Sequence, residues 1–169
     1  MPIEYHGELH ARADCERLLG HLRRKAGLQG FMTAPSPGII ATTMQNAHYD
    51  SPERYVFALA RALRKEYEVI ASSGLLLQID APDLAMERNV QFQDGSDRDF
   101  LDAIEFHIAA LNEALTNISR ERVRLHCCWG ATERPHDDDI DLGAILPIIR
   151  DARVGALSLP FSNPRHAHE

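Results

Sequence analysis

Short, strongly apolar segments alternate with single amphipathic helices along this chain, and that alternation limits the folds open to it. The predicted strands cover residues 30–34, 75–80, 123–128 and 156–159. Strongly apolar strands that are separated by single amphipathic helices are typical of a parallel sheet covered by helices. The sequence therefore predicts an α/β fold in a single domain.

Helix start and stop signals support this prediction. Residues 12–26 predict a short amphipathic helix, and residues 35–38 a backbone turn. Ser51, followed by Pro52, opens a helix that Gly74 closes. Its apolar positions are Val56, Leu59, Ala60, Leu63, Tyr67 and Ile70.

A capping-box variant of Ser96 and Asp99 opens the next predicted helix. The apolar positions of this helix are Phe100, Ile104, Ile108, Leu111 and Leu115. A last helix is expected to carry the apolar residues Leu142, Ile145, Leu146 and Ile149. Each helix thus offers one apolar stripe to a sheet.

Composition narrows the classes of partner. The 169 residues carry a net charge of −7 and no basic stripe, which argues against nucleic acid. No apolar stretch approaches the ~18 residues that span a bilayer, and three cysteines with a vicinal pair suggest a reducing, cytoplasmic setting. The acidic residues 137–139 and 141 are expected to form a solvated loop, with metal capture as the alternative.

Polar or reactive side chains stand at the carboxyl ends of three predicted strands. Gln78 and Asp80 end one strand, His126 and Cys128 another, and Ser158 the last. Such a gathering is typical of the active face of a (β/α)-barrel. A doubly wound sheet would place ligands there too, but no glycine-rich phosphate loop follows any strand.

The segment 123–130 makes the most specific chemical prediction. Because side chains alternate along a strand, Arg124, His126 and Cys128 share one face, and Cys127 lies on the other. An imidazole and a thiolate two residues apart are a plausible pair of zinc ligands. The alternative is a satisfied histidine beside a small buried thiol.

Four segments together resemble a known family in order and spacing. They are residues 30–38, residues 77–84, the His126-x-Cys128 pair and residues 156–165. As a set they resemble the catalytic domain of cobalamin-independent methionine synthase, related to uroporphyrinogen decarboxylase, over residues 30–169. The resemblance implies a TIM barrel that transfers a methyl group from a methyl-folate to homocysteine, a 5-methyltetrahydropteroyltriglutamate–homocysteine S-methyltransferase of methionine biosynthesis.

Site residues follow from the resemblance position by position. His126 and Cys128 match the first two zinc ligands, and zinc would hold the substrate thiol as a thiolate. Asp80, beside Gln78, matches the carboxylate that contacts the amino group of the thiol amino acid. No catalytic residue is assigned. His166 and His168 fall in a segment that the family shares, and Trp129 is expected either in the core or in a pocket wall.

The chain departs from the family pattern at the third ligand. Strand alternation puts Pro160 where the family has a glutamate, and proline has no donor atom for a metal. We expect residues 1–169 to be the central part of a partial TIM (β/α)8 barrel without its first and last strands, inactive alone. Self-association or a complementary barrel fragment would cover its open sheet. The alternatives are zinc-dependent alkyl transfer to another thiol and a non-catalytic assembly module.

Overall fold

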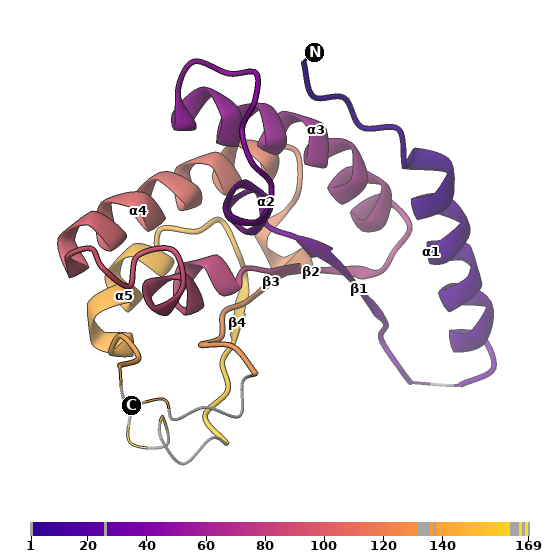
Figure 1. Ribbon diagram of the computed structural model, residues 1–169. Helices are drawn as coiled ribbons and strands as arrows, with labels where there is room; N and C mark the ends of the chain where they lie inside the picture. The colour runs from indigo at the N-terminus through magenta and orange to yellow at the C-terminus, as the bar shows by residue number, and fades with distance from the viewer. Residues whose placement is uncertain are drawn as a thin grey trace.

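The molecule is built on a four-stranded, all-parallel sheet with the strand order β1-β2-β3-β4 (Figure 1). The computed structural model describes residues 2–25, 27–131, 136, 138–162, 166 and 168. Its strands are β1 (Phe31–Pro35), β2 (Leu76–Asp80), β3 (Val123–His126) and β4 (Ala156–Ser158). Chain order and spatial order are the same, as in consecutive units of a (β/α)-barrel. The predicted α/β class and partial barrel are confirmed.

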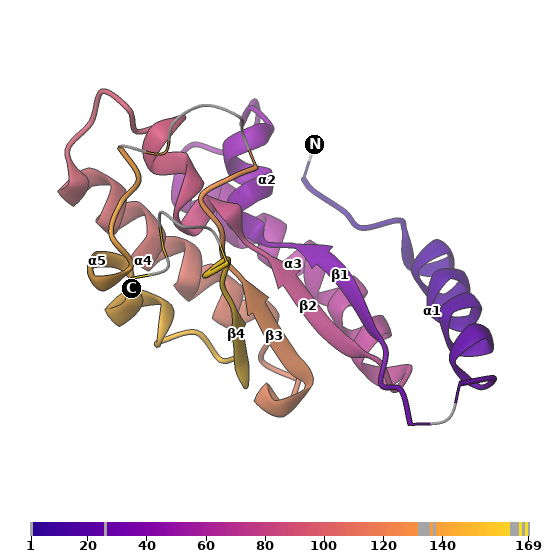
Figure 2. The ribbon, with the colours of Figure 1, turned by 90° about the horizontal axis from the view of Figure 1, so that it is seen from below.

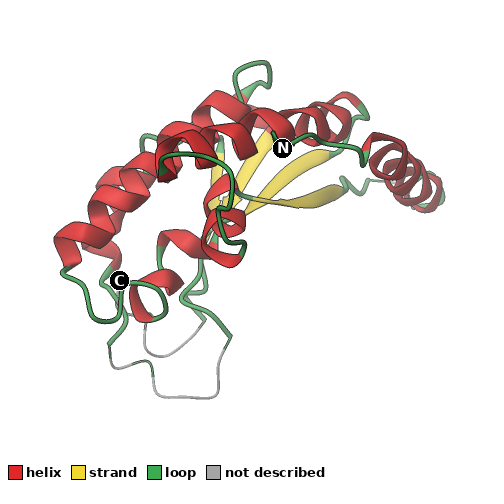
Figure 3. Cartoon of the chain, turned by 45° about the horizontal axis from the view of Figure 1, so that its top comes forward, coloured by secondary structure: helices red, strands yellow, loops and turns green. Residues whose placement is uncertain are grey.

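Helices connect the strands and lie along the sheet (Figure 3). They are α1 (Glu8–Leu22), α2 (Pro37–Thr43), α3 (Pro52–Ser72), α4 (Asp97–Ala114) and α5 (Leu142–Ile149). Three 3-10 turns complete the connections: η1 (Pro82–Leu84), η2 (Met86–Asn89) and η3 (Arg120–Arg122). No helix within the described residues is long and apolar enough to cross a membrane.

The two faces of the sheet differ in composition. On one face Leu77, Ile79 and Leu125 are fully buried against the apolar stripes of α3 and α4. Figure 2 shows the opposite face, with α3 and α4 behind the strands. We call this the open face, and it carries Phe31, Thr33, Leu76, Gln78, Asp80, Arg124, His126, Ala156 and Ser158. Because the helices of the described residues cover the first face, the open face remains available for a site.

The predicted helix starts are confirmed at two positions. The Ser51 hydroxyl accepts a hydrogen bond from the Arg54 main chain, and Gly74 ends α3 with a φ of 95°. Ser96 and Asp99 form a full capping box at the start of α4. These local signals therefore set the helix boundaries on which the sheet packs.

Two local predictions were wrong. Residues 35–38 do not form a simple turn, because Ser36 caps the short helix α2 by accepting a hydrogen bond from the Ile39 main chain. Proline at the first helical position fits this start, since its missing N–H is not needed there. The first helix also begins earlier than predicted, at Glu8, and ends at Leu22.

The asymmetry of the sheet can be tested on two adjacent leucines of β2. Leu77→Ala should lower the free energy of unfolding by about 3 kcal/mol, because it empties a fully buried site under the helices. Leu76→Ala, on the open face, should cost about 1 kcal/mol or less. Urea unfolding of the two variants measures both values. Equal losses would mean that both faces of the sheet are packed.

Candidate functional site

The carboxyl ends of β2 and β3 bring the predicted site residues to neighbouring positions. Asp80 lies in register with His126 on β3 and with Pro35 on β1, and His126 is in register with Ser158 on β4. Residues in register in a parallel sheet point to the same face. Asp80, His126 and Ser158 therefore form one row across the open face.

A chain of hydrogen bonds orients the Asp80 carboxylate. Arg124 Nε donates to Gln78 Oε1 at 2.8 Å, and Gln78 Nε2 donates to Asp80 Oδ1 at 3.1 Å. The Arg124 guanidinium also lies over the ring of Phe31, 4.2 Å from its centroid. Gln78 thus bridges a cation and a carboxylate, and it holds Asp80 at the end of its strand. All of these side chains lie on the open face.

His126 lies on the open face, and Cys127 and Cys128, which follow the end of β3, continue the alternation of burial. Burial alternates from Val123 to Trp129, with Cys127 fully buried and Cys128 half-buried. His126 Nδ1 lies 3.2 Å from the carbonyl oxygen of Ser158, to which it can donate. The other ring nitrogen, Nε2, makes no part of this contact. In metal-binding histidines, one ring nitrogen is commonly held by a carbonyl oxygen in this way while the other binds the metal. Burial raises the pKa of Cys127 well above its usual value.

The residues described do not complete a metal shell around this pair. Pro160 follows β4 and supplies no donor atom. Among the described residues, no group of three or more histidine, cysteine, aspartate or glutamate side chains could hold a metal ion. The metal roles of His126 and Cys128 therefore stay predictions, as do the substrate roles of Gln78 and Asp80.

The structure places one carboxyl-terminal histidine and part of the acidic run in the interior. His166 is buried, stacks on Trp129 with ring centroids 3.9 Å apart, and places Nε2 3.0 Å from Asp139 Oδ2. Trp129 belongs to the core and donates to the Ile140 carbonyl. The prediction of a solvated acidic loop was wrong for Asp139, because Asn89 and two histidines hold its carboxylate in the interior. Residues 137 and 163–165 lie outside the described residues.

A buried polar cluster behind the sheet was not predicted from the sequence. The Ser36 hydroxyl donates to Asp83 Oδ1 at 2.5 Å, and His107 Nδ1 lies 3.0 Å from Asp83 Oδ2. All three residues are at least nine-tenths buried. Gly38 makes room for them, since a Cβ there would lie 1.9 Å from Asp83 Oδ2. The signal available was a polar residue, His107, within the apolar stripe of a helix.

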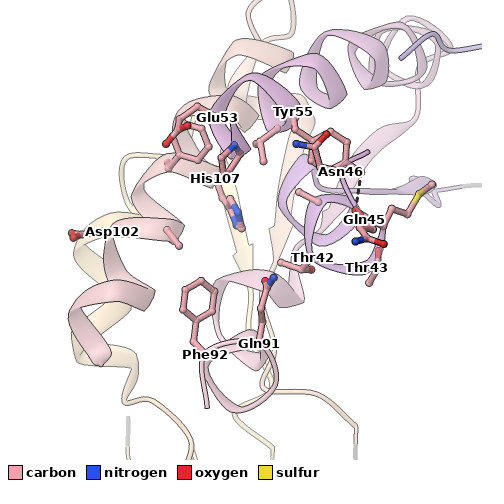
Figure 4. Close-up of a pocket in the computed structure, with 16 residues that line it drawn as sticks. Thr42, Thr43, Gln45, Asn46, Glu53, Tyr55, Gln91, Phe92, Asp102 and His107 are labelled. Carbon is pink, nitrogen blue, oxygen red and sulfur yellow. Dashed lines mark hydrogen bonds between the residues drawn. The ribbon is translucent and has the colours of Figure 1, made fainter. Parts of the chain in front are cut away.

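A pocket of about 750 Å³ opens beside this cluster. Its walls come from α2 and the loop after it, from the first turns of α3, from the middle of α4 and from the segment after η2 (Figure 4). The His107 ring projects into the space, and Phe92 and Gln91 lie across from it. The pocket shares no residue with the row of Asp80 and His126.

The fold has a counterpart among solved structures. The chain matches a B12-independent methionine synthase from Shewanella sp. W3-18-1, solved in complex with selenomethionine, with a TM-score of 0.64 and 21% sequence identity. The match covers 93% of this chain and 42% of the synthase, so this chain spans less than half of that protein. No protein-family model and no curated protein matches the sequence. The likeness shows a shared fold.

The two adjacent cysteines should differ sharply in reactivity. Cys128 should react with a thiol reagent such as dithiobis(nitrobenzoate) at least about tenfold faster than Cys127, because the buried thiol is shielded and its raised pKa leaves little thiolate. Peptide mapping after brief labelling identifies the modified thiol. Cys128→Ser should remove the fast phase, whereas Cys127→Ala should keep it. Fast labelling of Cys127 would contradict the assignment of the two faces.

Proposed function

We propose that this chain carries a methionine-synthase-like site for a thiol amino acid of the homocysteine type, in a degenerate form. The observation that carries the proposal is the row of Asp80 and His126 at the carboxyl ends of adjacent parallel strands. Barrel enzymes bind their substrates at this end of the strands. The fold shared with a B12-independent methionine synthase supports the same assignment.

Asp80 would bind the amino group of the ligand. Among the described residues, the side chain that donates to this carboxylate is Gln78, and it donates to Oδ1 alone. The half-buried carboxylate can therefore accept further hydrogen bonds from an ammonium group. Gln78 and Arg124 would keep the carboxylate in place as the ligand binds.

Zinc would be held only in part. His126 and Cys128 fit two positions of a zinc shell, but catalytic zinc sites keep three protein ligands, and Pro160 cannot be one. When bound in such sites, zinc lowers the pKa of a thiol and makes it a nucleophile at neutral pH. Because these residues do not complete the shell, we propose that this chain retains binding of the thiol amino acid and has lost methyl transfer from a methyl-folate.

Two other functions remain as hypotheses. Zinc-dependent alkyl transfer to a different thiol would use the same His126 and Cys128. A non-catalytic assembly module would account for Pro160 directly, because such a module needs no third ligand. Binding of homocysteine separates both from the proposal, because the alkyl-transfer enzyme would use a different thiol and the assembly module would bind none.

Further parallel strands are the partner that fits the unpaired edges of the sheet. Within the described residues β1 pairs only with β2, and β4 only with β3, so one edge of each outer strand is unpaired. Phe31 and Leu157, on these outer strands, are 45% and 38% exposed. Unpaired edges and exposed apolar side chains favour pairing with another sheet. A complementary set of barrel strands or a second copy would supply it.

The function can be tested by calorimetric titration of the 169-residue chain with homocysteine, with and without zinc. We expect measurable binding, weakened about tenfold by Asp80→Asn, because the neutral amide cannot form an ion pair with the ammonium group. Zinc alone should bind weakly, and Pro160→Glu should tighten it. His126→Ala should abolish the part of homocysteine binding that depends on zinc.

A matched pair of cysteine variants tests whether zinc binds at the proposed site. Cys128→Ser should lower zinc affinity, whereas Cys127→Ala should leave it unchanged, because that thiol is buried on the helix side. With zinc, homocysteine and methyl-folate, no methionine above background is expected from the unmodified chain. Tight zinc binding by the Cys128→Ser variant, or homocysteine binding indifferent to Asp80→Asn, would contradict the proposed site.

The open edges generate a separate prediction about assembly. Light scattering should show that the purified chain self-associates beyond its monomer mass of 19.0 kDa. The cause is the unpaired strand edges and the apolar side chains beside them. Phe31→Lys should weaken association, and Leu9→Lys, which alters an exposed leucine of α1 away from the sheet, should not. A stable monomer at high concentration would count against pairing through the unpaired strand edges.

A further inference from the structure

His107 is a buried side chain that is directed into the pocket of about 750 Å³ behind the sheet. It is 9% exposed, and Figure 4 shows its ring projecting into the space. Nδ1 lies 3.0 Å from Asp83 Oδ2, whereas Nε2 has no hydrogen-bond partner among the described residues. Buried polar atoms normally have such a partner. The free ring nitrogen therefore indicates that the pocket receives a ligand with a hydrogen-bonding group.

The kind of hydrogen-bonding group follows from the contacts of Asp83, whatever the charge of His107. A carboxylate only accepts, so Nδ1 carries a proton in the contact with Asp83. Nε2 is then an acceptor in the neutral imidazole and a donor in the imidazolium. A hydroxyl group fits both states, because it can donate as well as accept. An ammonium group or a carboxylate fits only one of them.

The charged residues of the lining direct no charge into the pocket. Glu53 is exposed, and Asp102 pairs with Arg98 at 2.7 Å and points away from the space (Figure 4). The lining contains no lysine or arginine, and Asp83 is not part of it. A charged ligand would lose hydration here without meeting a fixed opposite charge, which is costly. The wall therefore favours an uncharged ligand.

Two phenylalanines form an aromatic part of the wall. Phe92 lies in the segment after η2, and Phe106 belongs to α4. Each ring is held by a second ring from outside the lining. Phe100 contacts Phe92 edge to face with centroids 5.5 Å apart, and Phe57 contacts Phe106 in the same way at 5.4 Å. Rings supported in this way offer a preformed surface to an aromatic ligand.

Neutral polar side chains lie near these rings. Gln91 and Phe92 lie across the space from His107, and Thr42 lines the pocket from α2 (Figure 4). The amide and the hydroxyl offer donors and acceptors without a charge. The lining thus combines aromatic surface with uncharged hydrogen-bonding groups.

We propose that this pocket binds an uncharged aromatic molecule that carries a hydroxyl group. The hydroxyl forms a hydrogen bond with His107 Nε2, and the aromatic body packs against Phe92 and Phe106. Asp83 positions the His107 ring from the side away from the ligand. The pocket shares no residue with the site at the strand ends, so the proposal does not depend on the function proposed above.

Four probes that share a benzyl group test the proposal: benzyl alcohol, ethylbenzene, benzylamine and phenylacetate. In NMR titrations of the 169-residue chain at neutral pH, benzyl alcohol should bind at least about tenfold more tightly than the two ions, which lose hydration in the pocket. Ethylbenzene has a methyl group in place of the hydroxyl. It should bind about tenfold more weakly than the alcohol, because it leaves Nε2 without a partner. Equal or tighter binding of any other probe, or no binding of benzyl alcohol, would overturn the proposal.

A variant of His107 locates the binding to this pocket. His107→Asn should lose about tenfold in benzyl alcohol affinity. The asparagine amide can take the place of Nδ1 beside Asp83, but no atom takes the place of Nε2. His10→Asn, on the exposed surface of α1, should lose none. Unchanged affinity of a folded His107→Asn variant would contradict the proposed contact.

A second pair of variants decides the matter if His107→Asn does not fold. Phe92→Leu, which keeps an apolar side chain but removes the ring, should weaken benzyl alcohol binding severalfold. Phe161→Leu, the same change at an exposed position outside the lining, should not. In the unmodified chain, benzyl alcohol should shift the nitrogen resonance of His107 Nε2 more than that of Nδ1. Affinity unchanged by Phe92→Leu, together with no shift at Nε2, would overturn the proposal.

Discussion

The structure depends on burying one face of a parallel sheet under α3 and α4. Leu77, Ile79 and Leu125 drive this burial, because removing such side chains from water is worth about 2 kcal/mol each. Side chains alternate along a strand, so the same constraint turns Gln78, Asp80, Arg124 and His126 to the other face. The row of polar groups at the strand ends is therefore a direct result of core packing. Its chemistry depends on which side chains stand at the alternate positions.

Asp83 has a comparable role on the helix side. It joins the start of α2, through Ser36, to the middle of α4, through His107. The close approach requires Gly38, because any side chain there would collide with the carboxylate. A buried carboxylate without partners would be strongly destabilising, and here two donors satisfy it. The cluster thus fixes the walls of the pocket and the tautomer of the histidine that faces it.

The sequence was sufficient for the features that local physics determines. Short apolar segments between amphipathic helices predicted the four strands, and Ser51, Ser96 and Gly74 marked helix ends, because capping depends on residues a few positions apart. The His126 and Asp80 positions followed from strand parity. Contacts between distant segments could not be predicted in this way. Ser36 and Asp83 are 47 positions apart, and the side chain of Asp139 is buried because Asn89 and His166 reach it from remote parts of the chain.

The segment after β2 connects the two candidate sites. Asp80 ends the strand on the open face, and Asp83, three residues later, is buried on the helix side. Ser36 binds both ends of this short segment, since its main chain donates to the Asp80 carbonyl and its hydroxyl to the Asp83 carboxylate. One tightly held turn therefore positions a carboxylate on each side of the sheet. A change that loosens Ser36 would disturb both sites at once, whereas a change in Gln78 or in Phe92 would reach only one.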